Sequence, residues 1–251
     1  MGRPKISLVI PAYNEEKYIR PTLDAVMQAK QVYETTFSEG VEVIVVDNDS
    51  TDTTAMIAQE YGCNVIDFAQ HNIAAVRNAG AAQAQGEYLA FVDADASIIP
   101  EDTFVSIHTN LEQPEVFGGG SRMRPDKLGC LCGFFGFGLL DLLTYYVLID
   151  LQGLGLVLFY LRKKDFEEMN GFDETLYAFE DGEFGIRMKQ YAQVNHQRLV
   201  HLKKPVIVST RKNQLCSFSQ MWRSYFKLYN KDGARDMNNV YEMLYDVDHL
   251  R

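Results

Sequence analysis

The segment KISLVIPAYNEEKYI, residues 5–19, sets the architectural pattern of this chain. Residues 6–10 form a short apolar run that Pro11 ends, as expected of a buried strand. In the polar turn that follows, Asn14 is expected to cap a helix that runs to about Tyr33, with acidic residues in its first turn. A buried strand joined to a helix in this way is the repeating unit of an α/β domain.

The same unit recurs as far as residue 100. Apolar runs predict further strands at residues 41–46, 64–68 and 88–92, and helices are expected between them at 52–61 and 72–85. This alternation predicts a Rossmann-like α/β fold, with a mostly parallel central sheet flanked by helices. Such sheets bind ligands at the carboxyl ends of their strands.

The pattern loosens after Pro100. Gly118, Gly119 and Gly120 lie in an expected strand at 116–121 and indicate that a neighbour approaches it closely. Other elements expected in this part are helices at 101–111, near 134–149, and at 163–169, 180–192 and 218–229, with strands near 156–161 and at 206–209.

One domain is expected over residues 1–251, with a nucleotide-binding half at about 1–100 and an acceptor-binding half with C-terminal helices at about 101–251. Hydrophobic residues make up 47% of the chain, enough for a sizeable core. The net charge of −10 argues against nucleic acid as a partner, but it permits a nucleoside diphosphate if a metal ion separates the anions.

Localisation is expected to be cytoplasmic. The four cysteines form no zinc-site spacing and are interpreted as reduced thiols, and residues 1–5 show no signal-peptide pattern. The apolar stretch 128–161 is interrupted by Asp141 and Asp150, so no uncharged run reaches the ~20 residues that a membrane span needs. A buried or acceptor-covering helix is favoured there, and peripheral contact at the inner face of a membrane stays open.

Two acidic turns follow strands of the predicted sheet. Asp93 and Asp95 come directly after one strand, and oxygen-rich pairs of this kind suit Mg²⁺ or Mn²⁺ with phosphate oxygens and water completing the shell. The alternative is a solvated acidic turn. Asp47, after another strand, could accept a hydrogen bond from a base or ribose, whereas residues 48–52 are interpreted as an ordinary strand-to-helix turn.

Charged residues on two expected helices are further candidates. Arg77 lies in alanine-rich surroundings that suit a diphosphate or carboxylate partner, although a local surface pair is the alternative. Glu180 and Asp181 open a later helix, where the helix terminus favours the anion and apolar neighbours oppose it, a balance that suits a general base. Glu183 is expected to pair with Arg187 four residues on.

Six stretches taken together resemble glycosyltransferase family 2, the inverting enzymes of the GT-A fold. They occur in the family's order and span about residues 5–190. The stretches are 7–16 (SLVIPAYNEE), 45–52 (VVDNDSTD), 75–80 (AVRNAG), 91–95 (FVDAD), 170–174 (NGFDE) and 179–181 (FED).

The resemblance implies a role for each matching residue. Asp47 would bind the base, Arg77 would approach the nucleotide or diphosphate, and Asp93 would hold the ribose or a metal-bound water. Asp95 would bind the metal, and Asp181 would be the catalytic base with Glu180 beside it. The residues that would line the nucleotide pocket are Pro11, Ala12, Tyr13 and Glu15.

One departure from the family pattern concerns the metal. Many relatives supply a further ligand, often histidine, after the base helix, but residues 206–212 contain none and His201 matches poorly. Arg211 is expected to contact the diphosphate instead, which would leave Asp95, waters and phosphates around the metal.

The predicted function is therefore metal-assisted, inverting transfer of a sugar from a nucleotide-diphosphate sugar, UDP- or GDP-linked, to a hydroxyl of a glycan or lipid-linked acceptor. A nucleotidyltransferase is one alternative, but residues 11–15 are acidic and lack the glycine-rich loop of that class. A non-catalytic nucleotide-sugar-binding protein is the other, and the presence of both Asp95 and Asp181 argues against it.

Overall fold

A computed structural model of the chain describes residues 3–96, 98–125, 157–208 and 235–236. The strands are β1 Ile6–Ala12, β2 Val41–Asp47, β3 Asn64–Asp67, β4 Tyr88–Val92, β5 Val116–Ser121, β6 Met123–Pro125, β7 Leu158–Arg162, β8 Arg198–His201 and β9 Val206–Val208. The helices are α1 Ile19–Phe37, α2 Thr54–Glu60, α3 Ile73–Gln83, α4 Thr103–Leu111, α7 Lys163–Glu168 and α8 Glu180–Val194.

The main sheet has seven strands in the order β3-β2-β1-β4-β7-β5-β8, and β6 pairs with β9 in a separate small sheet. The first four strands are parallel, so their carboxyl ends meet at one edge. β7 runs antiparallel between β4 and β5, and β8 is parallel to β5. The prediction of a mostly parallel sheet flanked by helices is confirmed.

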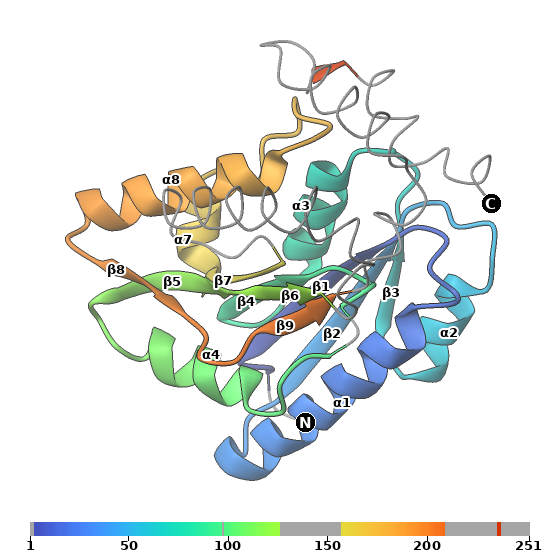
Figure 1. The fold of residues 1–251 in the computed structure, drawn as a ribbon, viewed down its shortest axis with the longest axis horizontal. Coiled ribbons are helices and arrows are strands. Elements are labelled where there is room, and N and C mark those ends of the chain that lie inside the picture. The colour runs from blue at the N-terminus through green and yellow to red at the C-terminus, as the bar shows by residue number, and fades with distance from the viewer. Residues whose placement is uncertain (1–2, 97, 126–156, 209–234, 237–251) are drawn as a thin grey trace, which may run out of the picture.

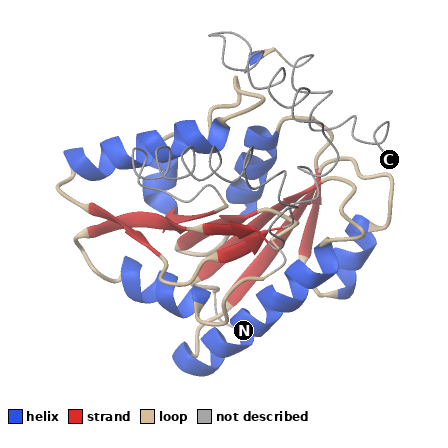
Figure 2. Cartoon of the chain, in the orientation of Figure 1, coloured by secondary structure: helices blue, strands red, loops and turns tan. Residues whose placement is uncertain are grey.

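Helices cover both faces of this sheet (Figures 1 and 2). α1, α2 and α4 lie on one face, where side chains such as Leu8, Val43 and Phe104 form a buried cluster. α3, α7 and α8 lie on the other face, over a second cluster that includes Phe91 and Phe172. Alternate residues of the central strands therefore serve opposite cores, which is why their sequences are apolar throughout.

α3 packs very closely on the sheet. A Cβ atom added at Gly80 would lie 2.4 Å from Val9 Cγ1, so only glycine fits at this contact. The close approach predicted for the glycine strand is likewise found, since a Cβ at Gly119 would lie 2.6 Å from the Tyr160 hydroxyl. That hydroxyl crosses the strand and donates to the Val200 carbonyl at 2.6 Å.

Two local predictions were wrong. α1 begins at Ile19 rather than after Asn14, because Asn14 adopts a left-handed conformation (φ 51°) and its side chain accepts from Thr51 instead. β8 was missed, because its sequence lacks an apolar run and it is only partly buried at the sheet's edge. The helices expected near 134–149 and at 218–229 lie outside the described residues. Among the residues that the structure describes, no helix is both long enough and apolar enough to span a membrane.

Candidate active site

Two loops at the carboxyl edge of the sheet are braced against each other. The Asn14 amide donates to Ser50 Oγ at 3.0 Å, and the Thr51 amide donates to Asn14 Oδ1 at 2.8 Å. The Glu15 amide donates to Thr54 Oγ1 at 2.8 Å. These bonds hold residues 12–16, after β1, against residues 48–54, after β2. The predicted pocket residues Pro11, Ala12, Tyr13 and Glu15 are thus next to the turn that carries Asp47.

Asp47 ends β2 directly beside Ala12 and is 6% exposed. Its Oδ2 accepts from the Ser50 amide at 3.2 Å, but its Oδ1 is buried and has no hydrogen-bond partner. A buried acceptor without a partner costs free energy in the folded protein. An N–H group of a ligand would remove that cost.

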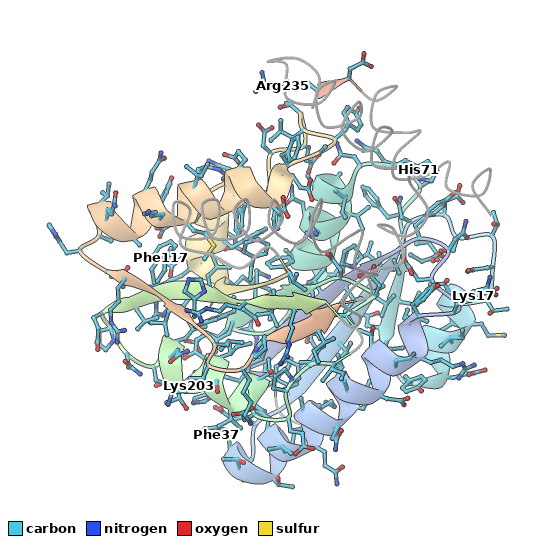
Figure 3. All side chains as sticks on the ribbon, viewed as in Figure 1. Lys17, Phe37, His71, Phe117, Lys203 and Arg235 are labelled. Atoms are coloured by element: carbon cyan, nitrogen blue, oxygen red, sulfur yellow. The ribbon has the colours of Figure 1, made fainter. Side chains whose placement is uncertain are left out.

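His71, on the loop between β3 and α3, belongs to the same edge and was not singled out in the sequence (Figure 3). Its ring meets that of Tyr13 edge-on, with centroids 5.2 Å apart. Asn48 holds this loop in place by donating to the carbonyls of Phe68 and Gln70 at 2.7 and 2.9 Å. A single histidine in a polar loop carries no periodic signal, so only the fold reveals this neighbour.

Arg77 projects from α3 into a buried cluster of carboxylates. Its Nη2 lies 2.8 Å from Asp93 Oδ1 and its Nη1 lies 2.5 Å from Glu180 Oε1. Burial by itself lowers the pKa of Arg77, but the charges of Asp93, Glu180 and Asp181 outweigh it and raise the pKa above its ordinary value. Arg77 is therefore a permanent cation that joins segments 16 and 103 residues away in sequence.

Asp93 and Asp95 occupy a turn at the end of β4. Thr22 of α1 anchors the turn by donating to the Ala94 carbonyl at 2.7 Å. Within the described part of the chain, no three His, Cys, Asp or Glu side chains are grouped as a metal-binding set. The turn thus offers one or two carboxylates, and phosphate and water would supply the remaining ligands, as is usual for Mg²⁺. The donor set fits a metal that arrives with a diphosphate.

Asp181 stands at the start of α8, one residue after the buried Glu180. Desolvation and the neighbouring charge of Glu180 raise the pKa of the Asp181 carboxyl to about 7, although Arg77 and the Gly182 amide oppose the shift. Because part of its surface is exposed, Asp181 can meet a substrate hydroxyl. A carboxylate with a pKa near neutrality is well matched to general base catalysis.

Residues 7–126 match the family model described as glycosyl transferase family 2. This match confirms the family resemblance for that part of the chain. Among its relatives, the glycosyltransferase AglE of Haloferax volcanii is 38% identical over 100 residues, which cover 38% of this chain and 31% of AglE. The chain spans about a third or less of the length of the curated relatives that it matches first.

Solved structures of glycosyltransferases share the fold. The Staphylococcus aureus TarS fragment 1–349 bound to UDP-GlcNAc superposes with a TM-score of 0.59 at 20% identity, over 98% of this chain and 73% of that one. The mannosyltransferase PcManGT of Pyrobaculum calidifontis, in complex with GDP-Man and Mn²⁺, has a TM-score of 0.63 at 20% identity, over 90% of this chain and 62% of that one. The fold is GT-A, as the resemblance implied.

Two other charged residues near this site have local partners. Glu183 makes a two-pronged pair with Arg187 on the surface of α8, with N···O distances of 2.6 and 2.7 Å. Asp173 accepts from the amide and the hydroxyl of Thr175, at 2.9 and 2.7 Å, within a turn. Arg211 lies outside the described residues.

Two asparagines hold the loop that leads to α8. Asn78 accepts from the Phe172 amide and donates to the Phe172 carbonyl, both at 2.9 Å. Asn72 donates to the Glu174 carbonyl at 2.8 Å, while its Oδ1 caps α3 by accepting from Ala75. The family-like stretches at 75–80 and 170–174 therefore lie together, and α3 positions the start of α8.

Proposed function

We propose that this chain is an inverting glycosyltransferase that moves a sugar from a nucleotide-diphosphate sugar to an acceptor hydroxyl. The observation that carries the proposal is the partly buried Asp181, with its raised pKa, at the same arginine cluster as the Asp93 turn. A proton acceptor beside an acidic, phosphate-compatible turn is what direct transfer to a hydroxyl requires.

The donor would lie across the carboxyl edge of the parallel strands. Asp47 would accept an N–H of the base at its unpaired Oδ1, with Tyr13 alongside and Pro11, Ala12 and Glu15 lining the pocket. Two relatives in fold support a UDP- or GDP-sugar donor, since TarS was solved with UDP-GlcNAc and PcManGT with GDP-Man.

Mg²⁺ or Mn²⁺ would be held by Asp95, with Asp93 contributing through its free oxygen or through water. When bound, the ion would neutralise charge on the departing diphosphate. Asp93 Oδ1 already faces Arg77, and the family resemblance assigns direct ligation to Asp95. Arg211 remains the predicted diphosphate contact.

Transfer would be one displacement. Asp181 takes the proton of the acceptor hydroxyl as its oxygen bonds to the anomeric carbon, and the bond from that carbon to the diphosphate oxygen breaks on the opposite face. The nucleoside diphosphate leaves with the bonding pair, and the anomeric configuration inverts. The acceptor would be a glycan or a lipid-linked sugar. In a nucleotidyltransferase, a sugar phosphate would instead attack the α-phosphorus of a nucleoside triphosphate and pyrophosphate would leave. That nucleophile is already an anion and needs no base.

The test uses UDP-GlcNAc and GDP-mannose with Mn²⁺, and follows release of the nucleoside diphosphate to water or to added glycan acceptors. Asp181→Asn should slow release by about 10²–10⁴-fold, because the proton acceptor is lost. Asp173→Asn is the matched control, since Asp173 faces Thr175. Wild-type protein that binds nucleotide and releases none would be a binding protein, and release of the sugar 1-phosphate would indicate attack at phosphorus, as in a nucleotidyltransferase.

A further inference from the structure

A line of three charges, two of them buried, runs beneath the proposed site. It consists of Glu180, Arg77 and Asp93, with Arg77 in the middle. The side chains of Arg77 and Glu180 are only 5% and 8% exposed, whereas Asp93 is 37% exposed. The line thus begins in the interior, at the helix that carries the base, and ends at the surface where the donor would bind.

Neither inner residue is free to meet a substrate. Arg77 directs one nitrogen to each carboxylate, and the ring of Phe172 lies 5.4 Å from its guanidinium carbon. Glu180 Oε1 is occupied by Arg77, and Glu180 is too buried to reach an acceptor hydroxyl. Their contribution must pass through the groups that they hold.

We propose that Glu180 and Arg77 are positioning residues that link the acceptor side of the site to the donor side, so that Glu180 governs nucleotide binding without touching nucleotide. The inference rests on the proposed function, which supplies the donor at Asp93. Glu180 holds one arm of the planar Arg77 fork, and the other arm holds Asp93 in the orientation that the donor meets.

The frame around this link is rigid. Asn78, one residue after Arg77 on α3, is bonded at both ends to Phe172 of the loop before α8. These bonds fix α3 relative to the loop that leads to α8, and they do not depend on the ion pairs of Arg77. Removing the charge of Glu180 leaves these hydrogen bonds intact. It releases only the guanidinium of Arg77, which can then turn toward Asp93.

Calorimetry of UDP and GDP binding in the presence of Mn²⁺ tests this link. Glu180→Gln should weaken whichever nucleotide the wild type binds by about tenfold, the scale found for residues that orient a ligand-binding group from behind. Glu183→Gln is the matched control, because Glu183 lies in the same helical turn and also pairs with an arginine, but at the surface. It should leave the dissociation constant unchanged.

Combining Glu180→Gln with Arg77→Lys tests whether the effect of Glu180 on nucleotide binding passes through Arg77. A lysine keeps the charge but cannot hold both carboxylates, so adding Glu180→Gln to it should cost almost nothing further. The link would be overturned if the effects of Arg77→Lys and Glu180→Gln on nucleotide affinity were fully additive. It would also be overturned if Glu180→Gln and Glu183→Gln bound nucleotide with equal affinity. If Arg77→Lys does not fold, Glu180→Asp is measured in its place. The shorter aspartate keeps the negative charge but moves the carboxylate oxygen away from Arg77. The affinity of this variant for nucleotide should therefore fall as in Glu180→Gln.

Failure of the proposed function would look different. Wild-type protein that binds neither UDP nor GDP with Mn²⁺ would overturn both conclusions. Nucleotide binding that Asp47→Ala weakens and Glu180→Gln leaves intact would overturn only the positioning role. Thermal unfolding of each variant establishes that it is folded before its affinity is compared.

Discussion

The two edges of the parallel strands carry similar polar groups and satisfy them differently. Where the strands begin, Glu42 Oε1 accepts from the hydroxyl of Ser7 and from the amides of Gln85 and Gly86. Where they end, Asp47 Oδ1 is buried with no partner. Figure 3 labels Phe37 near the first edge and His71 near the second.

Each edge also has a largely buried arginine. Arg162 donates to the main-chain carbonyls of Leu111, Gln113 and Val116, which closes the end of α4 against β5. Arg77 donates to carboxylates only, and with Asp181 nearby the cluster carries more negative than positive charge. At the first edge, these polar groups find their hydrogen-bond partners within the fold. At the second edge, an acceptor without a partner and a surplus of negative charge are available to a ligand.

The largest expected effect compares the two arginines. Arg77→Met should destabilise the protein by about 3–5 kcal/mol, because it leaves two carboxylates without their buried cation. Arg162→Met should cost about 1–3 kcal/mol, since it mainly leaves neutral carbonyls unsatisfied and loses a longer ion pair with Asp165, whose Oδ2 lies 3.6 Å from Arg162 Nη1. Urea unfolding at neutral pH measures both. Equal losses of unfolding free energy would mean that the charges around Arg77 are better hydrated than their burial indicates.

The next effect concerns the metal. Asp95→Asn removes a hard anionic ligand while preserving shape, so Mn²⁺-dependent affinity for nucleoside diphosphate should fall by at least about tenfold. Affinity measured without metal should be unchanged. Asp165→Asn, on α7 at the opposite edge, is the control. Mn²⁺-dependent binding that survives Asp95→Asn would move the metal to another ligand.

A crossed pair of variants separates binding from stability. Asp47→Ala should weaken nucleotide binding by about 1–3 kcal/mol, through loss of a buried acceptor, with little loss of unfolding free energy. Glu42→Ala should destabilise the fold by a similar amount and leave nucleotide binding unchanged. Calorimetry and urea unfolding of both variants give the four values. The distinction between the edges fails if either variant changes both quantities equally.

The last effect is a pH dependence of opposite sign at the two edges. Asp181 has a folded-state pKa of about 7 against a reference of 3.8, so the folded protein holds this proton more tightly and loses stability as pH rises between those values. Asp181→Asn should therefore gain in unfolding temperature relative to wild type as pH rises from 4 to 8. Wild-type transfer should fall as pH drops below 7, because the base becomes protonated.

Glu112 supplies the opposite case. Hydrogen bonds from Tyr88 and Lys5 lower the pKa of Glu112, so its contribution to stability is present above its reference pKa and is lost on acidification. Glu112→Gln should thus lose unfolding temperature relative to wild type at neutral pH and not at low pH. Thermal scans across the same pH range test both variants, and shifts of the same sign would contradict the assignment.

Local sequence was sufficient for most of the fold because its signals are local. The apolar runs of β1, β2 and β4 and the helical segment of α3 depend on neighbours a few residues away, and they appear close to where they were predicted. The polar residues after those strands could be assigned to one edge, because parallel strands end together. The helix cap predicted at Asn14 was wrong because a polar side chain that suits a helix cap can equally accept a hydrogen bond from a second loop.

The tertiary structure alone determined which charges meet. Arg77 finds Glu180 from 103 residues away, through a sheet in which β7 is inserted antiparallel between β4 and β5. The sequence of α3 is the same whether its arginine faces solvent, a phosphate or a buried carboxylate. Burial and partnership are properties of packed segments, so the unpaired oxygen of Asp47 and the raised pKa of Asp181 exist only once distant elements have excluded water from them.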